Sequence, residues 1–148
     1  MDLSELKLVR GEAGSVSPKE LSPLTLAYVG DAVFELFVRL TVLTDGNAPV
    51  NRLHKKAKNI VNAKAQAAIY FKIAPLLTEE EESVFRRGRN AKSHTTPKNM
   101  DLMDYRHATG LEALFGYLYL KGEKERALEL FSLGAVDWIE SKGNGEGK

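Results

Sequence analysis

The chain has 148 residues, of which 43% are hydrophobic and 28% charged, and its formal net charge is +1 at pH 7. This length fits one domain with a sizeable core. The sequence contains no cysteine, which excludes disulfides and thiolate metal sites, so we expect a cytoplasmic protein. No apolar run reaches the roughly 18–20 residues that cross a bilayer. The N-terminus also lacks the apolar block of a signal peptide, so no membrane partner is expected.

The charges are unevenly distributed along the chain. Between Arg52 and Lys98 there are 11 lysines and arginines against four acids, a local balance of +7. The remaining 10 lysines and arginines and 16 acids give −6. A basic middle between acidic ends is the usual electrostatic mark of a polyanion partner. Solvated helix faces would produce the same pattern, and composition alone does not distinguish the two.

Apolar residues recur with helical spacing nearly everywhere, and strand-like alternation is absent, which predicts a single all-α bundle. Ser22 and Thr78 are expected N-caps, the latter with Glu81 at capping-box spacing. The predicted domain layout is an N-terminal extension over residues 1–20, a helical domain over 21–141 and a disordered tail over 142–148. In chain order, the expected helices span residues 23–43, 50–71, 78 to the loop that begins at 88, 101–120 and 123–140.

Two acids stand alone in otherwise apolar helices. Asp31 follows Gly30 in "LAYVGDAVFELFVRL", and Glu112 lies in "ATGLEALFGYLYL" with glycines at positions 110 and 116. A buried ionised carboxylate costs several kcal/mol unless a cation or several donors compensate it. A glycine within a helix is unfavourable unless another group approaches the backbone closely. If the two helices pack together, both carboxylates could hold Mg²⁺, with Mn²⁺ as a substitute, because these cations prefer oxygen ligands.

Salt bridges offer a simpler explanation of these acids, for example between Asp31 and Arg106. Because the pattern occurs on two helices and a basic segment lies nearby, the sequence favours neither the salt bridges nor the metal site. Glu35 needs no such site, because it is spaced for a helical ion pair with Arg39.

The segment "RRGRNAKSHTTPKN" combines cations with small polar residues. Arginine and lysine bind phosphates, while hydroxyl and amide groups contact sugars. The segment has no aromatic residue for stacking on single-stranded bases, so double-stranded RNA, read through its shape, phosphates and 2′-hydroxyls, is the better fit. A soluble loop without a ligand is the alternative. The candidate RNA-binding residues here are Arg86, Arg87, Arg89, Asn90, Lys92, Ser93 and Lys98.

Two of these stretches carry a resemblance to a known family. "LAYVGDAVFEL" resembles the short ribonuclease III motif L-E-F-L-G-D-(A/S)-V-L, and "ATGLEALFGYLYL" resembles its partner motif. With "LHKKAKNIVNAKAQA", "LTEEEESVFRRGRNAKS" and "TPKNMDLMDYRHATGLEAL", the similarity narrows to the Mini-ribonuclease III group, from about Leu21 to Leu120. The resemblance implies a helical bundle of the ribonuclease III endonuclease-domain type.

The resemblance also implies which residues form the site. The catalytic, metal-binding pair would be Asp31 and Glu112, while the positions of the family's two other acids hold Ala27 and Thr109. Asp101, at the start of the helix that carries Glu112, is a candidate third metal ligand. The group's members lack the usual double-stranded-RNA-binding domain, so the chain would grip RNA with its own basic surface.

The activity implied is that of a Mg²⁺-dependent endoribonuclease which cuts both strands of an RNA duplex and leaves 5′-phosphate and 3′-hydroxyl ends. It would act as a homodimer, with Tyr28 inserted into the partner subunit, and with Arg106 and His107 near the scissile bond. The implied task is maturation of bacterial large-subunit (23S) ribosomal RNA precursors, and a large-subunit ribosomal protein is a candidate partner. The alternatives are a non-catalytic RNA-binding ribosome assembly factor and a Mg²⁺-dependent nucleotide pyrophosphohydrolase. The pyrophosphohydrolase is disfavoured because the dense acids of "TEEEE" are explained by helix capping.

Overall fold

The computed structural model describes residues 17–92 and 98–145, with side chains up to Trp138, and all regular structure in these residues is helical. The predicted all-α class is therefore confirmed. Short 3₁₀ turns precede or follow three of the helices, at Pro18–Glu20 (η2), Leu43–Asp45 (η3) and Ala74–Leu76 (η4). The α-helices are α1 (Pro23–Val42), α2 (Val50–Lys58), α3 (Ala63–Ile73), α4 (Glu79–Arg89), α5 (Leu102–Leu120) and α6 (Lys124–Gly145).

The expected helix starts are present with their caps. The Ser22 hydroxyl accepts the Thr25 amide at 3.2 Å. At the start of α4, the Thr78 hydroxyl accepts the Glu81 amide at 3.1 Å, and the Glu81 carboxylate accepts the Thr78 amide at 2.9 Å. This reciprocal pair satisfies two of the free N–H groups at the helix start, and the predicted capping box is confirmed.

The prediction of a single helix over residues 50–71 is wrong, because the structure divides this segment into α2 and α3. Asn62 takes an extended backbone conformation (φ −156°, ψ 156°) and caps α3 by accepting the Ala65 amide at 2.9 Å. Its side-chain amide also donates to the Lys58 carbonyl at 2.8 Å, which closes the end of α2. The apolar spacing hid this break because Ile60 in the link is itself buried.

Two other helix ends also differ from expectation. α4 continues to Arg89, so Gly88 lies inside the helix, where its position is explained by packing. α6 continues to Gly145, so residues 142–145 are helical and do not belong to a disordered tail. Residues 146–148 lie outside the described part of the chain.

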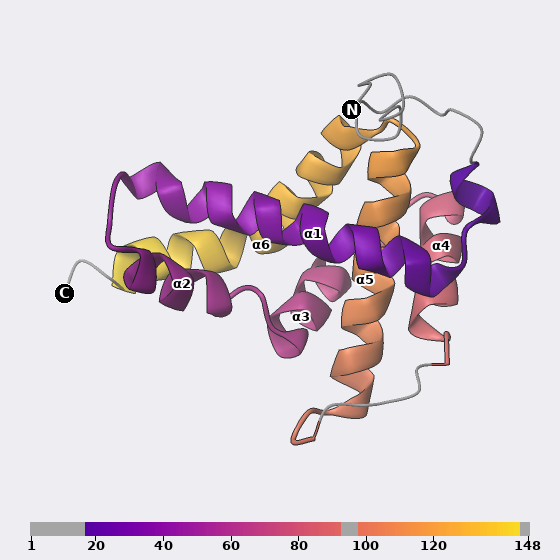
Figure 1. The fold of residues 1–148 in the computed structure, drawn as a ribbon, viewed down its shortest axis with the longest axis horizontal. Helices are drawn as coiled ribbons and strands as arrows, with labels where there is room; N and C mark the ends of the chain where they lie inside the picture. Colours follow the sequence, from indigo (N-terminus) through magenta and orange to yellow (C-terminus); the bar gives the residue numbers. More distant parts are fainter. Residues whose placement is uncertain (1–16, 93–97, 146–148) are drawn as a thin grey trace, which may run out of the picture.

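α5 is the central helix of the bundle. It packs against α1, α3, α4 and α6, and α1 lies across it in Figure 1. An aromatic cluster joins three helices, with the Phe34 ring 5.7 Å from that of Phe115 and 5.5 Å from that of Phe131. Because α5 is surrounded, its residues are mostly buried, and a polar side chain on it must find a partner within the fold.

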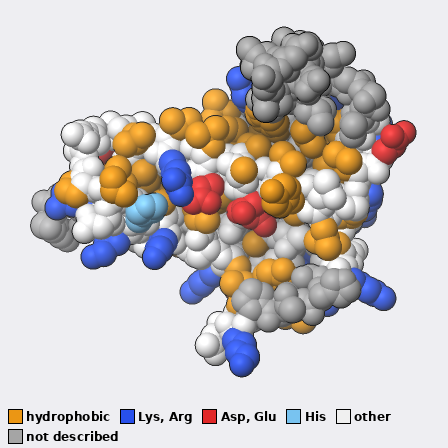
Figure 2. Space-filling view, viewed as in Figure 1, with side chains coloured by type: hydrophobic (Ala, Val, Ile, Leu, Met, Phe, Trp, Pro, Cys, Tyr) orange, Lys and Arg blue, Asp and Glu red, His pale blue; other side chains and the backbone are white. Residues whose placement is uncertain are grey.

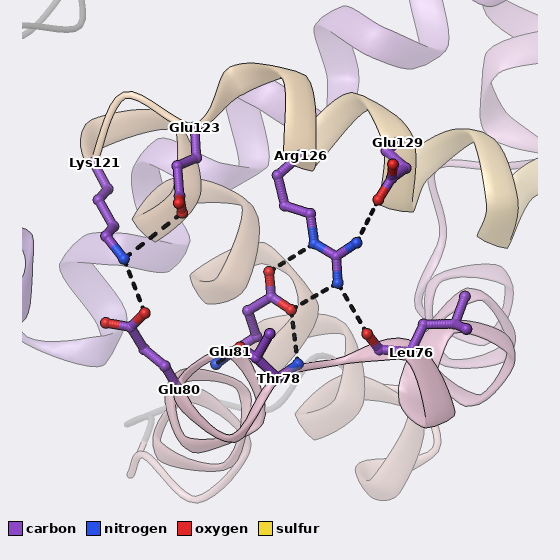
Figure 3. A network of polar contacts seen from close by, with 8 residues as sticks. All are labelled: Leu76, Thr78, Glu80, Glu81, Lys121, Glu123, Arg126 and Glu129. Atoms are coloured by element: carbon purple, nitrogen blue, oxygen red, sulfur yellow. Dashed lines mark hydrogen bonds and ion pairs between the residues drawn. The ribbon is translucent and has the colours of Figure 1, made fainter.

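A polar network fixes α6 to the start of α4 (Figure 3). Arg126 donates to both Glu81 carboxylate oxygens, at 2.8 and 2.9 Å, and to the Leu76 carbonyl at 2.9 Å. Burial alone would raise the pKa of Glu81, but the hydrogen bonds and charge of Arg126, with the Thr78 amide, hold this pKa below its ordinary value. Glu81 is thus a buried acid with a purely structural explanation.

Candidate active site

The crossing of α1 and α5 brings the two solitary acids together. A Cβ placed on Gly30 would lie 1.6 Å from the Glu112 carbonyl oxygen, and one on Gly116 would lie 2.0 Å from the Leu26 carbonyl oxygen. The two helix backbones therefore touch, which only glycine permits. Asp31, next to Gly30, is consequently held against Glu112, and the glycine beside the aspartate has its explanation.

The pair is electrostatically coupled. Burial, a hydrogen-bonding contact with Asp31 and the negative charge of that residue together raise the pKa of Glu112 to about 8, and burial has the largest effect. Gln66 on α3 acts in the opposite direction and lowers the pKa. Asp31 is exposed to solvent while Glu112 is partly buried, and with its pKa raised to about 8 the Glu112 carboxyl group keeps its proton at neutral pH. A divalent cation would replace that proton favourably.

Salt bridging does not explain this pair. Within the described residues, neither Asp31 nor Glu112 forms an ion pair, and Arg106 is exposed without pairing to either. The expected pair of Glu35 and Arg39 does form, at 3.0 Å. A salt bridge therefore explains Glu35, but none explains Asp31 or Glu112 in the described residues.

The donor set is limited to these two carboxylates. In the described part of the chain, no group of three or more histidine or acidic side chains is placed to share a metal ion. Asp101 is used as the N-cap of α5, where it accepts the Asp104 amide at 3.0 Å. The structure thus does not bring this candidate third ligand into a cluster with the pair.

The residues at the family's two other acidic positions cannot replace those acids. Ala27 is 8% exposed and has no polar side chain. Thr109 donates its hydroxyl to the Tyr105 carbonyl at 3.0 Å, so its one side-chain proton is used within the helix. Two carboxylates nevertheless suit Mg²⁺, which binds through one or two such groups and keeps water or phosphate as its other ligands.

Gln66 is the site residue that the sequence analysis missed. It is 5% exposed, and its Nε2 has no hydrogen-bond partner of ordinary geometry although it lies toward Glu112. Buried amides are almost always paired, so an unpaired one requires an explanation. The available signal was a lone amide on the apolar side of "AKAQAAIY".

The predicted RNA-binding residues of α4 lie on a helix that packs against α5, the helix that carries Glu112. Gly88 packs against Gly110 of α5, with its added Cβ only 3.0 Å from the Gly110 Cα, two residues before Glu112. Arg86 and Arg87, ahead of Gly88, are exposed on the last turns of α4. This contact fixes the basic end of α4 against the same central helix, on a face of α5 different from the one that meets Gly30 of α1.

The remaining candidates of this segment differ in exposure. Arg89 is half-buried, with its guanidinium 5.8 Å from the Phe85 ring centroid, and it donates to the Asn90 side chain at 3.0 Å. Lys92 and Lys98 are exposed, whereas Ser93 lies outside the described residues. The cationic groups available for phosphate contact are thus mainly those on the exposed side of α4 and at the two described ends of the loop.

The two candidates on α5 have different environments. Arg106 is exposed. His107 is 8% exposed, its Nδ1 lies 2.7 Å from the Met103 carbonyl oxygen, and its ring packs 4.9 Å from that of Phe71. We therefore assign His107 to packing and leave it out of the candidate RNA surface.

A space-filling view shows how these charges are distributed on one face. In Figure 2, acidic side chains lie over the middle of α1, and lysine and arginine side chains lie along the side toward α2 and α3. The exposed cations on those two helices are Arg52, Lys55, Lys58, Lys64 and Lys72. A negatively charged site with a cationic border is suited to a polyanion whose phosphate reaches the acids through a divalent cation. In the described residues, no helix is both long and apolar enough to span a membrane.

Comparison with known proteins agrees with this arrangement. Residues 24–123 match the Ribonuclease III domain family. The chain is 53% identical over 113 residues to a Mini-ribonuclease 3 of Thermoanaerobacter sp., covering 76% of this chain and 80% of that protein. It is 52% identical over 124 residues to a Mini-ribonuclease 3 of Symbiobacterium thermophilum, covering 84% and 95%.

A solved structure agrees as well. The crystal structure of a protein from Fusobacterium nucleatum superposes with a TM-score of 0.72 at 35% identity, over 80% of this chain and 95% of that one. The chain therefore belongs to the ribonuclease III family. Within that family it falls in the Mini-ribonuclease 3 group, and it is an endoribonuclease of the type that cleaves double-stranded RNA.

Proposed function

We propose that this chain is a Mg²⁺-dependent endoribonuclease which, as a cytoplasmic homodimer, cuts both strands of a duplex in large-subunit (23S) ribosomal RNA precursors. The observation that carries the proposal is the convergence of Asp31 and Glu112 where α1 and α5 touch. Their carboxylates would hold Mg²⁺, for which Mn²⁺ can substitute. Bound there, the cation would lower the pKa of the attacking water and offset negative charge on the reacting phosphate.

The chain's own residues perform the remaining tasks in this reaction. Asp31 is exposed, so its carboxylate is accessible from the RNA side, while Glu112 is anchored in the central helix. Attack of water forms a new bond to phosphorus, and the bond to the 3′-oxygen breaks. The 3′-oxygen then takes up a proton, which yields 5′-phosphate and 3′-hydroxyl ends. Arg86 and Arg87, exposed on α4, would hold the RNA backbone by contacts to its phosphates.

A homodimer would supply the second strand's site. Tyr28 is 81% exposed, three residues before Asp31 on α1, and Leu24, Leu36 and Leu40 continue an exposed apolar row on this helix at 41–55% exposure. An exposed apolar row of this kind favours a protein contact. A two-fold operator would relate two acid pairs as it relates the two antiparallel strands of a duplex.

The test is cleavage of a perfect RNA duplex with Mg²⁺ by the wild type and by Asp31→Asn. We expect two-strand cleavage by the wild type and none by the variant, while both bind the duplex in the absence of divalent cations. Binding by both proteins without cleavage by either would overturn the proposal. That outcome would favour a non-catalytic RNA-binding ribosome assembly factor, whose activity was lost with the acids replaced by Ala27 and Thr109.

A further inference from the structure

Gln66 occupies a place where an unpaired amide is unfavourable. Its side chain is 5% exposed, and its Nε2 has no hydrogen-bond partner of ordinary geometry in the described residues, although the amide is close enough to the Glu112 carboxyl group to lower its pKa. A buried donor without an acceptor loses the hydrogen bonds that it makes to water in the unfolded chain. An apolar side chain of similar shape would avoid this loss, so stability alone does not account for a glutamine here.

Among the described residues, Glu112 is the polar group on which the Gln66 side chain acts. Its immediate neighbours on α3, Ala65 and Ala67, are buried alanines that offer no side-chain acceptor. α3 packs against α5, and the amide acts on the Glu112 carboxyl group, whose other polar neighbour is Asp31. Gln66 and Asp31 are thus the two polar groups of the described structure that influence Glu112.

We propose that Gln66 is a positioning residue whose Nε2 donates a hydrogen bond to the Glu112 carboxylate when that carboxylate binds a divalent cation. This inference rests on the proposed function, because it requires the acid pair to be a metal site. Groups that hydrogen-bond to a metal ligand fix its orientation, and their loss typically weakens metal binding or activity by about 10–100-fold. The donor that is unpaired without the cation would then be satisfied in the cation-bound state.

The test uses Gln66→Met, which keeps the length of the side chain and removes its donor, and Gln66→Leu as a second apolar replacement. Binding of Mn²⁺ alone, followed by electron paramagnetic resonance without RNA, should be about 10-fold or more weaker in both variants. Their thermal unfolding without metal should occur at the same temperature as in the wild type or higher, because the unpaired amide is gone. A merely structural role would instead lower this temperature.

A second measurement separates positioning from chemistry. If Gln66 only orients Glu112, a high Mn²⁺ concentration should restore most of the duplex cleavage that either variant loses at low Mn²⁺. Unchanged Mn²⁺ affinity in both variants would overturn this inference and leave the proposed function intact. Unfolding of both variants without metal would also overturn it, because Gln66 would then be required for the fold.

The matched controls are Asp31→Asn and Glu112→Gln, which should abolish the binding of Mn²⁺ that the wild type shows. If the wild type binds Mn²⁺ no better than these controls, the acid pair is not a metal site. That result would overturn the proposed function and this inference together. The failure of the inference alone is therefore distinguishable from failure of the proposal on which it rests.

Discussion

Replacing Glu112 with glutamine should stop cleavage and yet stabilise the metal-free protein at high pH. In the fold, the pKa of Glu112 is raised from 4.5 to about 8, first by burial and then by Asp31. The folded chain therefore holds this proton more tightly than the unfolded chain. The resulting stabilisation is fully present below pH 4.5 and is progressively lost as the pH rises to about 8. Glutamine does not ionise, so the variant avoids this loss.

The size of the effect follows from the pKa. A rise from 4.5 to about 8 is 3.5 pH units, which at about 1.4 kcal/mol per unit sets an upper limit of about 5 kcal/mol. Solvent reaches the pair through the exposed Asp31, and water screens such interactions, so we expect about half of this limit, roughly 2 kcal/mol. At pH 5 most of the stabilisation remains, and the two proteins should differ by less than about 1 kcal/mol.

The assay is urea unfolding in the presence of a chelator at pH 5 and pH 8.5. The control is Glu81→Gln, which removes a buried acid whose pKa is shifted in the opposite direction. The pKa of Glu81 is held down by its environment, with Arg126 as its partner, so its stabilising contribution is present above pH 4.5 and is lost as the pH falls. Removing one partner of such a buried pair should cost about 3 kcal/mol at pH 8.5. If Glu112→Gln proves less stable than the wild type at pH 8.5, as Glu81→Gln should be, then Glu112 is a structural acid and our reasoning is refuted.

Three further variants, one of them a double substitution, test the helix crossing, the basic surface and the dimer. Gly30→Ala should cost about 3 kcal/mol in urea unfolding, because its Cβ would lie 1.6 Å from a carbonyl oxygen of α5. Ala68→Gly, at an exposed helical position, should cost only about 1 kcal/mol, and equal costs for the two would contradict the backbone contact. Replacing Arg87 and Arg89 with alanine should weaken duplex binding and reduce the slope of log K against log salt by about two. An unchanged slope would remove the end of α4 from the RNA interface. Tyr28→Asp should shift the protein toward monomers in analytical ultracentrifugation and reduce two-strand cleavage; an unaltered sedimentation coefficient would argue against the α1 contact.

Local features of the sequence determined most of the helical framework. The capping box of Thr78 and Glu81 depends on residues three apart, and the ion pair of Glu35 and Arg39 on residues four apart. Such interactions are complete within one turn of helix, so the sequence alone predicts them. The break at Asn62 was missed, because apolar spacing continues through the link and its cap depends on a backbone conformation that spacing does not reveal.

The candidate site was predictable in part. Two lone acids beside glycines indicated a close helix contact, and the family motifs implied that Asp31 and Glu112 form a pair. His107 was expected near RNA, but its burial depends on an aromatic ring from α3. No residue within one turn of His107 on its own helix reveals that packing.

Only the tertiary structure shows that the pKa of Glu112 depends on side chains from two other helices. Asp31, Gln66 and Glu112 come from three helices, and their interaction exists only because α1 and α3 both pack on α5. Neither the raised pKa of Glu112 nor the unpaired amide of Gln66 is a property of any local segment. Sequence thus determined which side chains are available and which helices carry them, whereas desolvation and charge coupling depend on distances between helices that only the folded chain establishes.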